Sequence, residues 1–402
     1  MSHFIYADHA ATTAVSDTAL QAMLPHFTTA YGNPSSLYRF AQEGKTDLER
    51  ARAEIAACLN ARPEEIYFTS GGTEADNWAL RGVAELMALK GRKGGHIITS
   101  AIEHHAVLHT AQYLEKQGYE VTYLPVDGRG LVDPAALEGA IRPDTILISI
   151  MAANNEIGTI EPVAELGRIA RAHKVLFHTD AVQAVGHIPV DVEAWNVDLL
   201  SLSAHKFRGP KGVGALYVKK PLRLPALIQG GGQEKGRRSG TENVPGAVGM
   251  AAALREAVGG LSRESPRLAA LRDRLIDGLT GLPYTRLTGD PVNRLPGTAS
   301  FVFEGVEGEA LLRLSFLCFN DISAMSAYHR QIRALIPADR NPWTQGSPSV
   351  LMLYHSKSGS LDRENDEMRE CMPIYSRVAS GHGSGAATIM QAETEFIRGN
   401  LA

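Results

Sequence analysis

The sequence predicts an α/β fold whose large domain holds a mostly parallel, seven-stranded sheet. Strand-like and helix-like stretches alternate from about residue 48 to 255, which is typical of a parallel sheet covered by helices. The chain has 402 residues, more than one hydrophobic core usually supports. We therefore expect a second, smaller domain beside the large one.

The elements follow in order from the hydrophobic pattern. Leu48, Ala51, Ile55 and Leu59 form one helical stripe, and residues 74–88 form the next helix. Short runs with strand-like composition separate the helices, and several are apolar enough for burial on both faces of a sheet. The expected strands are 65–69, 96–100, 120–124, 145–150, 175–179, 199–203 and 214–218.

The pattern changes after the polar, glycine-rich stretch 229–241. Leucines between residues 268 and 279 fit a long amphipathic helix that starts near Pro266. We place the boundary between the two domains near residues 255–265.

Composition and charge narrow the classes of function. The formal net charge of −4 gives no electrostatic reason to expect nucleic acid or an anionic membrane as a partner. Cys58, Cys318 and Cys371 lie far apart in no CxxC pattern, which argues against a disulfide framework or a zinc site. No run approaches eighteen apolar residues, and residues 1–6 lack the features of a signal peptide. We expect a cytoplasmic protein that binds no metal.

Two residues that follow apolar runs indicate the chemistry. Lys206 comes after the run 197–202 and before a stretch rich in glycine and proline. Burial lowers the pKa of a lysine amine and makes it a nucleophile toward carbonyls. Asp180 follows the run 175–179, and a carboxylate there keeps a pyridine nitrogen protonated. Together they predict a site for pyridoxal 5′-phosphate (PLP) with Lys206 as the Schiff-base residue.

Polar groups follow other expected strands as well. The small-residue turn 69–76 leads into a helix, where backbone N–H groups and the hydroxyl of Thr73 suit a phosphate. His104 is placed to stack on a cofactor ring, and Asn155 and Gln183 to face the same ligand. Taken singly, helix capping, turn capping or a surface position explains each of them better. Their occurrence at successive strand ends favours the PLP site.

Eight segments resemble the NifS/IscS-like cysteine desulfurases of the class V aminotransferase family. The similarity is dense from residue 5 to about 312, and the set of motifs is highly specific. The matching segments are Tyr6–Thr13, Gly32–Ser36, Thr69–Asn77, Glu103–His104, Ala153–Gly158, His178–Gln183, Ser203–Gly212 and Gly236–Asn243.

The resemblance implies a PLP-dependent transferase of fold type I. It implies a large domain of residues 16–258 and a smaller α+β domain made of residues 1–15 and 259–402. Thr241 would reach the phosphate in the neighbouring subunit, so the resemblance also implies a homodimer with shared active sites. His104 would also act as acid or base near the substrate sulfur.

The other site residues that the resemblance implies hold the cofactor. Lys206 would form the Schiff base, and Asp180 would meet the pyridine nitrogen. Asn155 and Gln183 would lie on the side of the phenolic oxygen, with His104 on the ring. The phosphate would be held by Gly72, Thr73, Ser203 and His205.

The implied reaction removes sulfur from L-cysteine to give alanine and sulfane sulfur for iron–sulfur cluster or thio-cofactor synthesis. A sulfur-acceptor or scaffold protein is therefore an implied partner. In the family a loop cysteine attacks the substrate sulfur, but the aligned segment 323–328 ends here in Tyr328. A phenol forms no persulfide, and with a pKa near 10 it is mostly protonated at pH 7.

The sequence beyond residue 312 departs from the family, either through divergence or through a change of reading frame near residues 313–328. The arginine that the family uses for the substrate carboxylate is not found, and Arg333 and Lys357 are weak candidates. Cys318 lies in an apolar context that favours a core position, whereas Cys371 lies in a charged stretch.

Two alternatives to desulfuration stay open. One is another PLP-dependent reaction, by a lyase acting on selenocysteine or cysteine sulfinate or by an aminotransferase. The other is an impaired PLP-binding protein that serves as a partner in sulfur or iron–sulfur assembly.

Overall fold

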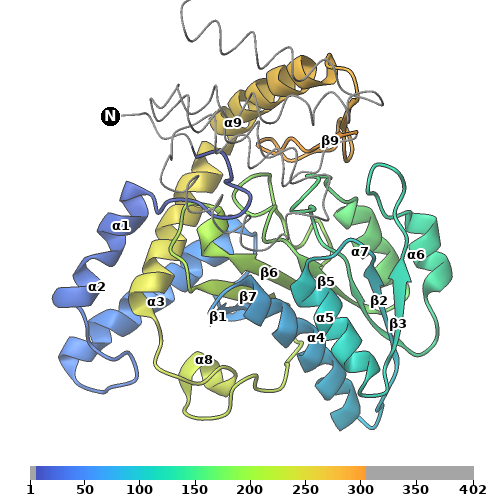
Figure 1. The fold of residues 1–402 in the computed structure, drawn as a ribbon. Coiled ribbons are helices and arrows are strands. Elements are labelled where there is room, and N and C mark those ends of the chain that lie inside the picture. Colours follow the sequence, from blue (N-terminus) through green and yellow to red (C-terminus); the bar gives the residue numbers. More distant parts are fainter. Residues whose placement is uncertain (1–5, 305–402) are drawn as a thin grey trace, which may run out of the picture. The chain divides into compact units, whose positions relative to one another are not determined.

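The computed structural model describes residues 6–304 of the chain. The chain divides into two compact units, Met1–Val302 and Phe303–Ala402. The first unit contains the sheet and the helices discussed below (Figure 1). Among the helices that the structure describes, none is long and apolar enough to cross a membrane.

A seven-stranded sheet forms the centre of the first unit, as predicted. Its strand order is β1-β7-β6-β5-β4-β2-β3. β7 runs antiparallel to both of its neighbours, and the remaining pairs are parallel. The strands are β1 (Ile66–Thr69), β2 (His96–Ser100), β3 (Glu120–Leu124), β4 (Thr145–Ser149), β5 (Leu176–Asp180), β6 (Leu199–Ser203) and β7 (Gly214–Val218).

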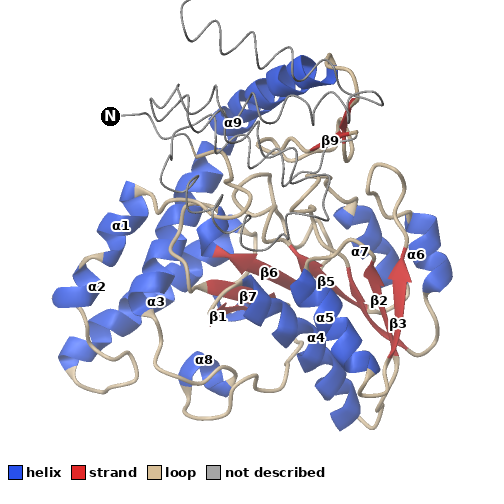
Figure 2. Cartoon of the chain, in the orientation of Figure 1, coloured by secondary structure: helices blue, strands red, loops and turns tan. Residues whose placement is uncertain are grey.

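Helices cover both faces of this sheet because its central strands are apolar on both sides (Figure 2). In β4, Leu147 packs with α4 and α5, while the adjacent Ile148 belongs to the core cluster that includes α3, α7 and α9. A small second sheet pairs β8 (Thr285–Leu287) with β9 (Phe301–Phe303). The α-helices are α1 (Asp17–Met23), α2 (Pro25–Thr28), α3 (Arg39–Cys58), α4 (Gly72–Leu89), α5 (His105–Glu115), α6 (Pro134–Ala140), α7 (Val163–Ala172), α8 (Gln233–Gly236) and α9 (Val244–Thr280).

The helix expected to start near Pro266 starts much earlier. α9 begins at Val244, where the side chain of Asn243 accepts a hydrogen bond from the Gly246 N–H at 3.0 Å. Its first turns are buried and pack on α1 and α3, which keeps this part helical. Pro266 lies inside the helix and removes one backbone N–H donor. The helix continues through this position because tertiary packing stabilises it. The sequence prediction was wrong here because it took the proline for a start signal.

Gly167 of α7 offers a stability test of the close contact between this helix and the backbone of Trp195. A Cβ atom at this position would lie 1.9 Å from the carbonyl oxygen of Trp195, so an alanine forces the backbone apart. We expect Gly167→Ala to lower the free energy of unfolding by about 1–3 kcal/mol. Gly139 in α6 is the control, because nothing lies within 4 Å of its added Cβ. Urea unfolding should show Gly139→Ala unchanged or stabilised by up to about 1 kcal/mol; equal effects would refute the packing argument.

Candidate active site

A cavity of about 400 Å³ lies at the carboxyl ends of the parallel strands. Ligands bind at this edge in open α/β sheets because the strand ends deliver polar groups there. The cavity brings together every predicted site residue except Thr241. Those residues are Gly72, Thr73, His104, Asn155, Asp180, Gln183, Ser203, His205 and Lys206.

Lys206 is placed by β6, which continues into a short 3-10 helix, Ala204–Lys206. Its Nζ donates hydrogen bonds to the carbonyl oxygens of Ala10 at 2.5 Å and Ala11 at 2.9 Å. Burial lowers the pKa of the Lys206 amine, although the nearby carboxylates of Asp180 and Asp8 oppose this. The lowered pKa increases the share of neutral, nucleophilic amine.

Asp180 is the last residue of β5 and is only 5% exposed. Its Oδ1 accepts a hydrogen bond from the Val182 N–H at 2.9 Å. Burial raises the pKa of Asp180, while that hydrogen bond and the electrostatic interactions with His104 and Lys206 act in the opposite direction. A cationic ring nitrogen in the cavity would compensate the buried carboxylate.

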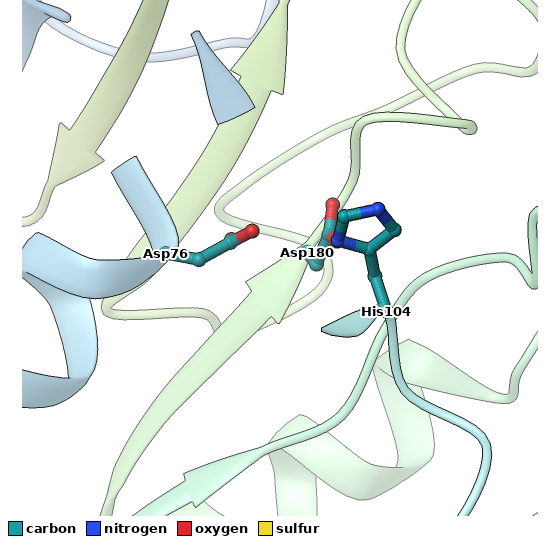
Figure 3. A group of neighbouring side chains, drawn as sticks. All are labelled: Asp76, His104 and Asp180. Carbon is teal, nitrogen blue, oxygen red and sulfur yellow. The ribbon is translucent and has the colours of Figure 1, made fainter. Parts of the chain in front are cut away.

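His104 caps the N-terminus of α5. Its Nδ1 accepts a hydrogen bond from the Ala106 N–H at 3.1 Å, which fixes the proton of a neutral ring on Nε2. The ring lies beside Asp180, and Asp76 points toward both from α4 (Figure 3). One ligand atom of each of these three side chains lies within 4.8 Å of the others. His104 therefore faces the cavity with a hydrogen-bond donor.

The first turn of α4 is suited to a phosphate. Its N-terminal N–H groups lack partners within the helix, and the helix dipole favours an anion there. Close packing fixes the turn, since a Cβ on Gly72 would lie 2.7 Å from Val182 Cγ2. Arg238 holds Glu74 of the same turn through two hydrogen bonds, at 2.8 and 3.1 Å.

The N-terminal segment supplies a wall of the cavity that sequence reasoning missed. Asp8, Ala10 and Ala11 line it. Thr13 anchors the segment, because its N–H and its hydroxyl both donate to the carbonyl oxygen of His205, at 3.0 and 2.8 Å. The motif Tyr6–Thr13 marked this segment as part of the resemblance, but nothing in the motif predicted its contacts with Lys206 and His205.

Asp76 and Met151 are two further lining residues that the sequence analysis did not single out. Asp76 stands four residues after Gly72, so it lies one helical turn beyond the phosphate turn. That spacing could have placed it near the cavity. Asn154, by contrast, is structural: its Oδ1 accepts from the N–H groups of Glu156 and Ile157, and its Nδ2 donates to Ile102.

Thr241 does not line the cavity of Lys206 in this chain. It lines a second cavity of about 80 Å³ with residues that include Glu234 and Arg238.

Cys58 is half-buried against the core, and burial raises the pKa of its thiol. The other residues considered as sulfur acceptors or as partners of the substrate carboxylate lie outside the described residues. They are Cys318, Tyr328, Arg333, Lys357 and Cys371.

The family model for aminotransferase class-V matches residues 5–320. The chain belongs to this family. This confirms the resemblance seen in the motifs, and the family uses PLP as its cofactor. The residues present fit PLP, because the cavity combines an amine, a buried carboxylate and a helix N-terminus that suits a phosphate.

Several known proteins are similar to this chain over most of its length. The cysteine desulfurase IscS of Methanosarcina thermophila is 54% identical over 310 residues, which are 77% of this chain and 76% of that protein. A mitochondrial cysteine desulfurase of Arthroderma benhamiae is 49% identical over 77% of this chain and 62% of its own length. Among solved structures, a NifS-like protein matches with a TM-score of 0.75 and 44% identity, covering 78% of this chain and 85% of that one. SspA in complex with cysteine matches with a TM-score of 0.69 and 38% identity, covering 78% and 86%.

The buried carboxyl of Glu103, the residue before His104, should make the stability of the protein depend on pH. Its Oε1 accepts from the Ser100 hydroxyl at 2.6 Å and the Met151 N–H at 2.9 Å, while its Oε2 has no hydrogen-bond partner. Burial raises the pKa of Glu103 to about 8. The folded state then binds a proton that the unfolded state releases above about pH 4.5, so this carboxyl makes stability fall as pH rises toward 8.

We expect the free energy of unfolding to lose up to about 1.4 kcal/mol per pH unit from Glu103 between pH 5 and 8. Glu103→Gln should flatten this part of the slope, because glutamine carries no titrating proton. Urea unfolding of both proteins at pH 5, 6, 7 and 8 measures the difference. Parallel slopes in wild type and variant would show that Glu103 is ionised in the folded state.

Proposed function

We propose that the protein is a PLP-dependent cysteine desulfurase that removes sulfur from L-cysteine and releases alanine. The observation that supports this best is the single cavity in which Lys206, Asp180 and His104 meet. Relatives named cysteine desulfurase that are about half identical to the chain support the same assignment, as does the similar structure that contains cysteine.

The residues divide the work according to their positions. PLP, when bound, withdraws electrons from the substrate Cα and so loosens its bonds. Asp180 holds the proton of the ring nitrogen, and the first turn of α4 binds the phosphate with Gly72 and Thr73. The neutral amine of Lys206 attaches the cofactor and moves the proton of the substrate Cα. His104 Nε2 moves the proton at the substrate sulfur, while Asn155, Gln183, Ser203 and His205 orient the cofactor.

The fate of the sulfur is the part of the proposal that the sequence makes unusual. Tyr328 stands where the family's loop cysteine is expected, and a phenol takes up no sulfane sulfur. We propose that another thiol, on this chain or from outside, accepts the sulfur, and that the product feeds iron–sulfur cluster or thio-cofactor synthesis. Tyr328 also favours the second candidate, a lyase on cysteine sulfinate or selenocysteine, because these reactions need no protein thiol.

The assembly is proposed on the same grounds. We propose a homodimer in which Thr241 completes the phosphate site of the neighbouring subunit, since in its own chain Thr241 lies in a cavity separate from that of Lys206. We also propose that residues 16–258 form the large domain and residues 1–15 and 259–402 the small one. Cytoplasmic location stays a prediction from the sequence.

The test follows alanine production by the PLP-loaded protein with L-cysteine, with and without an added small thiol. The proposal expects alanine in catalytic amounts and a further rise in Tyr328→Cys. If cysteine perturbs the visible band of the cofactor but alanine forms in neither protein, desulfuration is refuted. Alanine and sulfite from cysteine sulfinate, without alanine from cysteine, would establish the lyase instead.

A further inference from the structure

Asp76 is a buried carboxyl group in the cavity for which the proposed reaction has no assigned role. It lies on α4, is 1% exposed and lines the same cavity as Lys206. Its Oδ1 has no hydrogen-bond partner and lies 3.7 Å from His178 Nε2. A carboxyl oxygen of Asp76 and one of Asp180 lie within 4.8 Å of each other, with Asp76 directed at the end of β5 (Figure 3).

Asp76 faces His178 on the side of the sheet and His104, within 4.8 Å, on the side of the cavity. His178 is fully buried, and its two ring nitrogens lie 2.8 Å from the Ser149 hydroxyl and 3.0 Å from the Ser201 hydroxyl. Burial lowers the pKa of His178 to about 3, so this ring is neutral. The nearby Ser201 lowers the pKa of Asp76 only in part, and the neighbouring carboxyl of Glu103 brings no positive charge.

Asp180 is the better placed of the two carboxyls to stay ionised. It accepts a backbone N–H, and both His104 and Lys206 favour its charge. Burial, followed by the charge of Asp180, raises the pKa of Asp76 well above its usual range. Two carboxyls this close in a buried site do not both ionise, so one proton remains on the pair.

We propose that Asp76 is a positioning residue that keeps this proton and, as a neutral acid, leaves Asp180 as the single anion facing the cofactor ring. The inference rests on the proposed function for the cofactor but not on desulfuration itself. A second negative charge at Asp76 would raise the pKa of Asp180 and so weaken Asp180 as the anion that keeps the ring nitrogen protonated. The neutral acid instead fills the space beside Asp180 without adding charge.

The pH midpoint of the visible absorption band of the PLP-loaded protein tests the charge. The band reports the proton held between Lys206 and the cofactor, and this proton responds to every charge near the ring. Asp76→Asn keeps the shape without a titrating proton, so its midpoint should stay within about 0.2 pH units of wild type. Asp180→Asn is the positive control and should lower the midpoint by about one unit or more. A similar drop in Asp76→Asn would show that Asp76 is ionised and would overturn the proposal.

Infrared difference spectroscopy of the loaded protein tests the proton directly. Wild type minus Asp76→Asn should show the carbonyl stretch of a protonated carboxylic acid, shifted in heavy water, at neutral pH. A carboxylate band in its place would overturn the proposal. Asp76→Ala removes the side chain without replacing it, and we expect its affinity for PLP to fall about tenfold or more while Asn retains it. Failure of desulfuration alone would change none of these readouts.

Discussion

Lys206→Ala is expected to lose the covalent attachment of PLP and to lower alanine formation by at least about 10³-fold. Lys206 combines the two properties that the chemistry needs. Its amine lies in the cavity, and burial lowers its pKa. The carbonyl oxygens of Ala10 and Ala11 fix its position. Alanine removes the nucleophile and the base for the substrate Cα proton in one substitution.

Borohydride reduction of the loaded protein followed by peptide mass analysis measures the attachment, and an alanine assay measures the reaction. Lys116 at the end of α5 is the control, because it is exposed and does not line the cavity. Lys116→Ala should keep both the attachment and the rate. Cofactor still bound covalently to another lysine in Lys206→Ala would contradict the assignment.

The sequence predicted the part of the site that depends on strand ends. Lys206, Asp180 and His104 each follow a short apolar run, and parallel strands bring such positions to one edge of the sheet. Because that rule needs only the order of the strands, it works without knowledge of any tertiary contact. The same reasoning gave the seven strands to within a residue or so at each end.

Contacts between distant segments were beyond this reasoning. The hydrogen bond from Lys206 to Ala10 joins residues 196 positions apart, and no periodicity within either segment predicts it. The early start of α9 was missed for the same reason, since packing on α1 and α3 outweighs the proline signal. The importance of Asp76 likewise depends on β5 and β6, which place His178 and Ser201 beside it.

The second large effect is expected on the free energy of unfolding when a buried ion pair beside strand β1 is broken. Arg52 of α3 and Glu234 of α8 are nearly fully buried and form two hydrogen bonds, at 2.8 and 2.7 Å. Glu234 also accepts from the Phe68 N–H at 2.9 Å, and Arg52 donates to the Ile66 carbonyl at 2.8 Å. We expect Glu234→Ala to lower the free energy of unfolding by about 3–5 kcal/mol, because it leaves the Arg52 charge buried without its partner.

The double variant Arg52→Met/Glu234→Leu separates the loss of the pair from the loss of packing. A hydrophobic pair of similar size needs no charge compensation, so the double variant should be more stable than Glu234→Ala alone. Urea unfolding of the three proteins measures both differences, and a double variant less stable than the single one would contradict this account.

Glu234 has a left-handed backbone, with φ of +46°, which a residue other than glycine adopts at a cost. Its carboxylate thus ties the glycine-rich segment 229–241, with Thr241 at its end, to the strand β1 that leads into the phosphate turn.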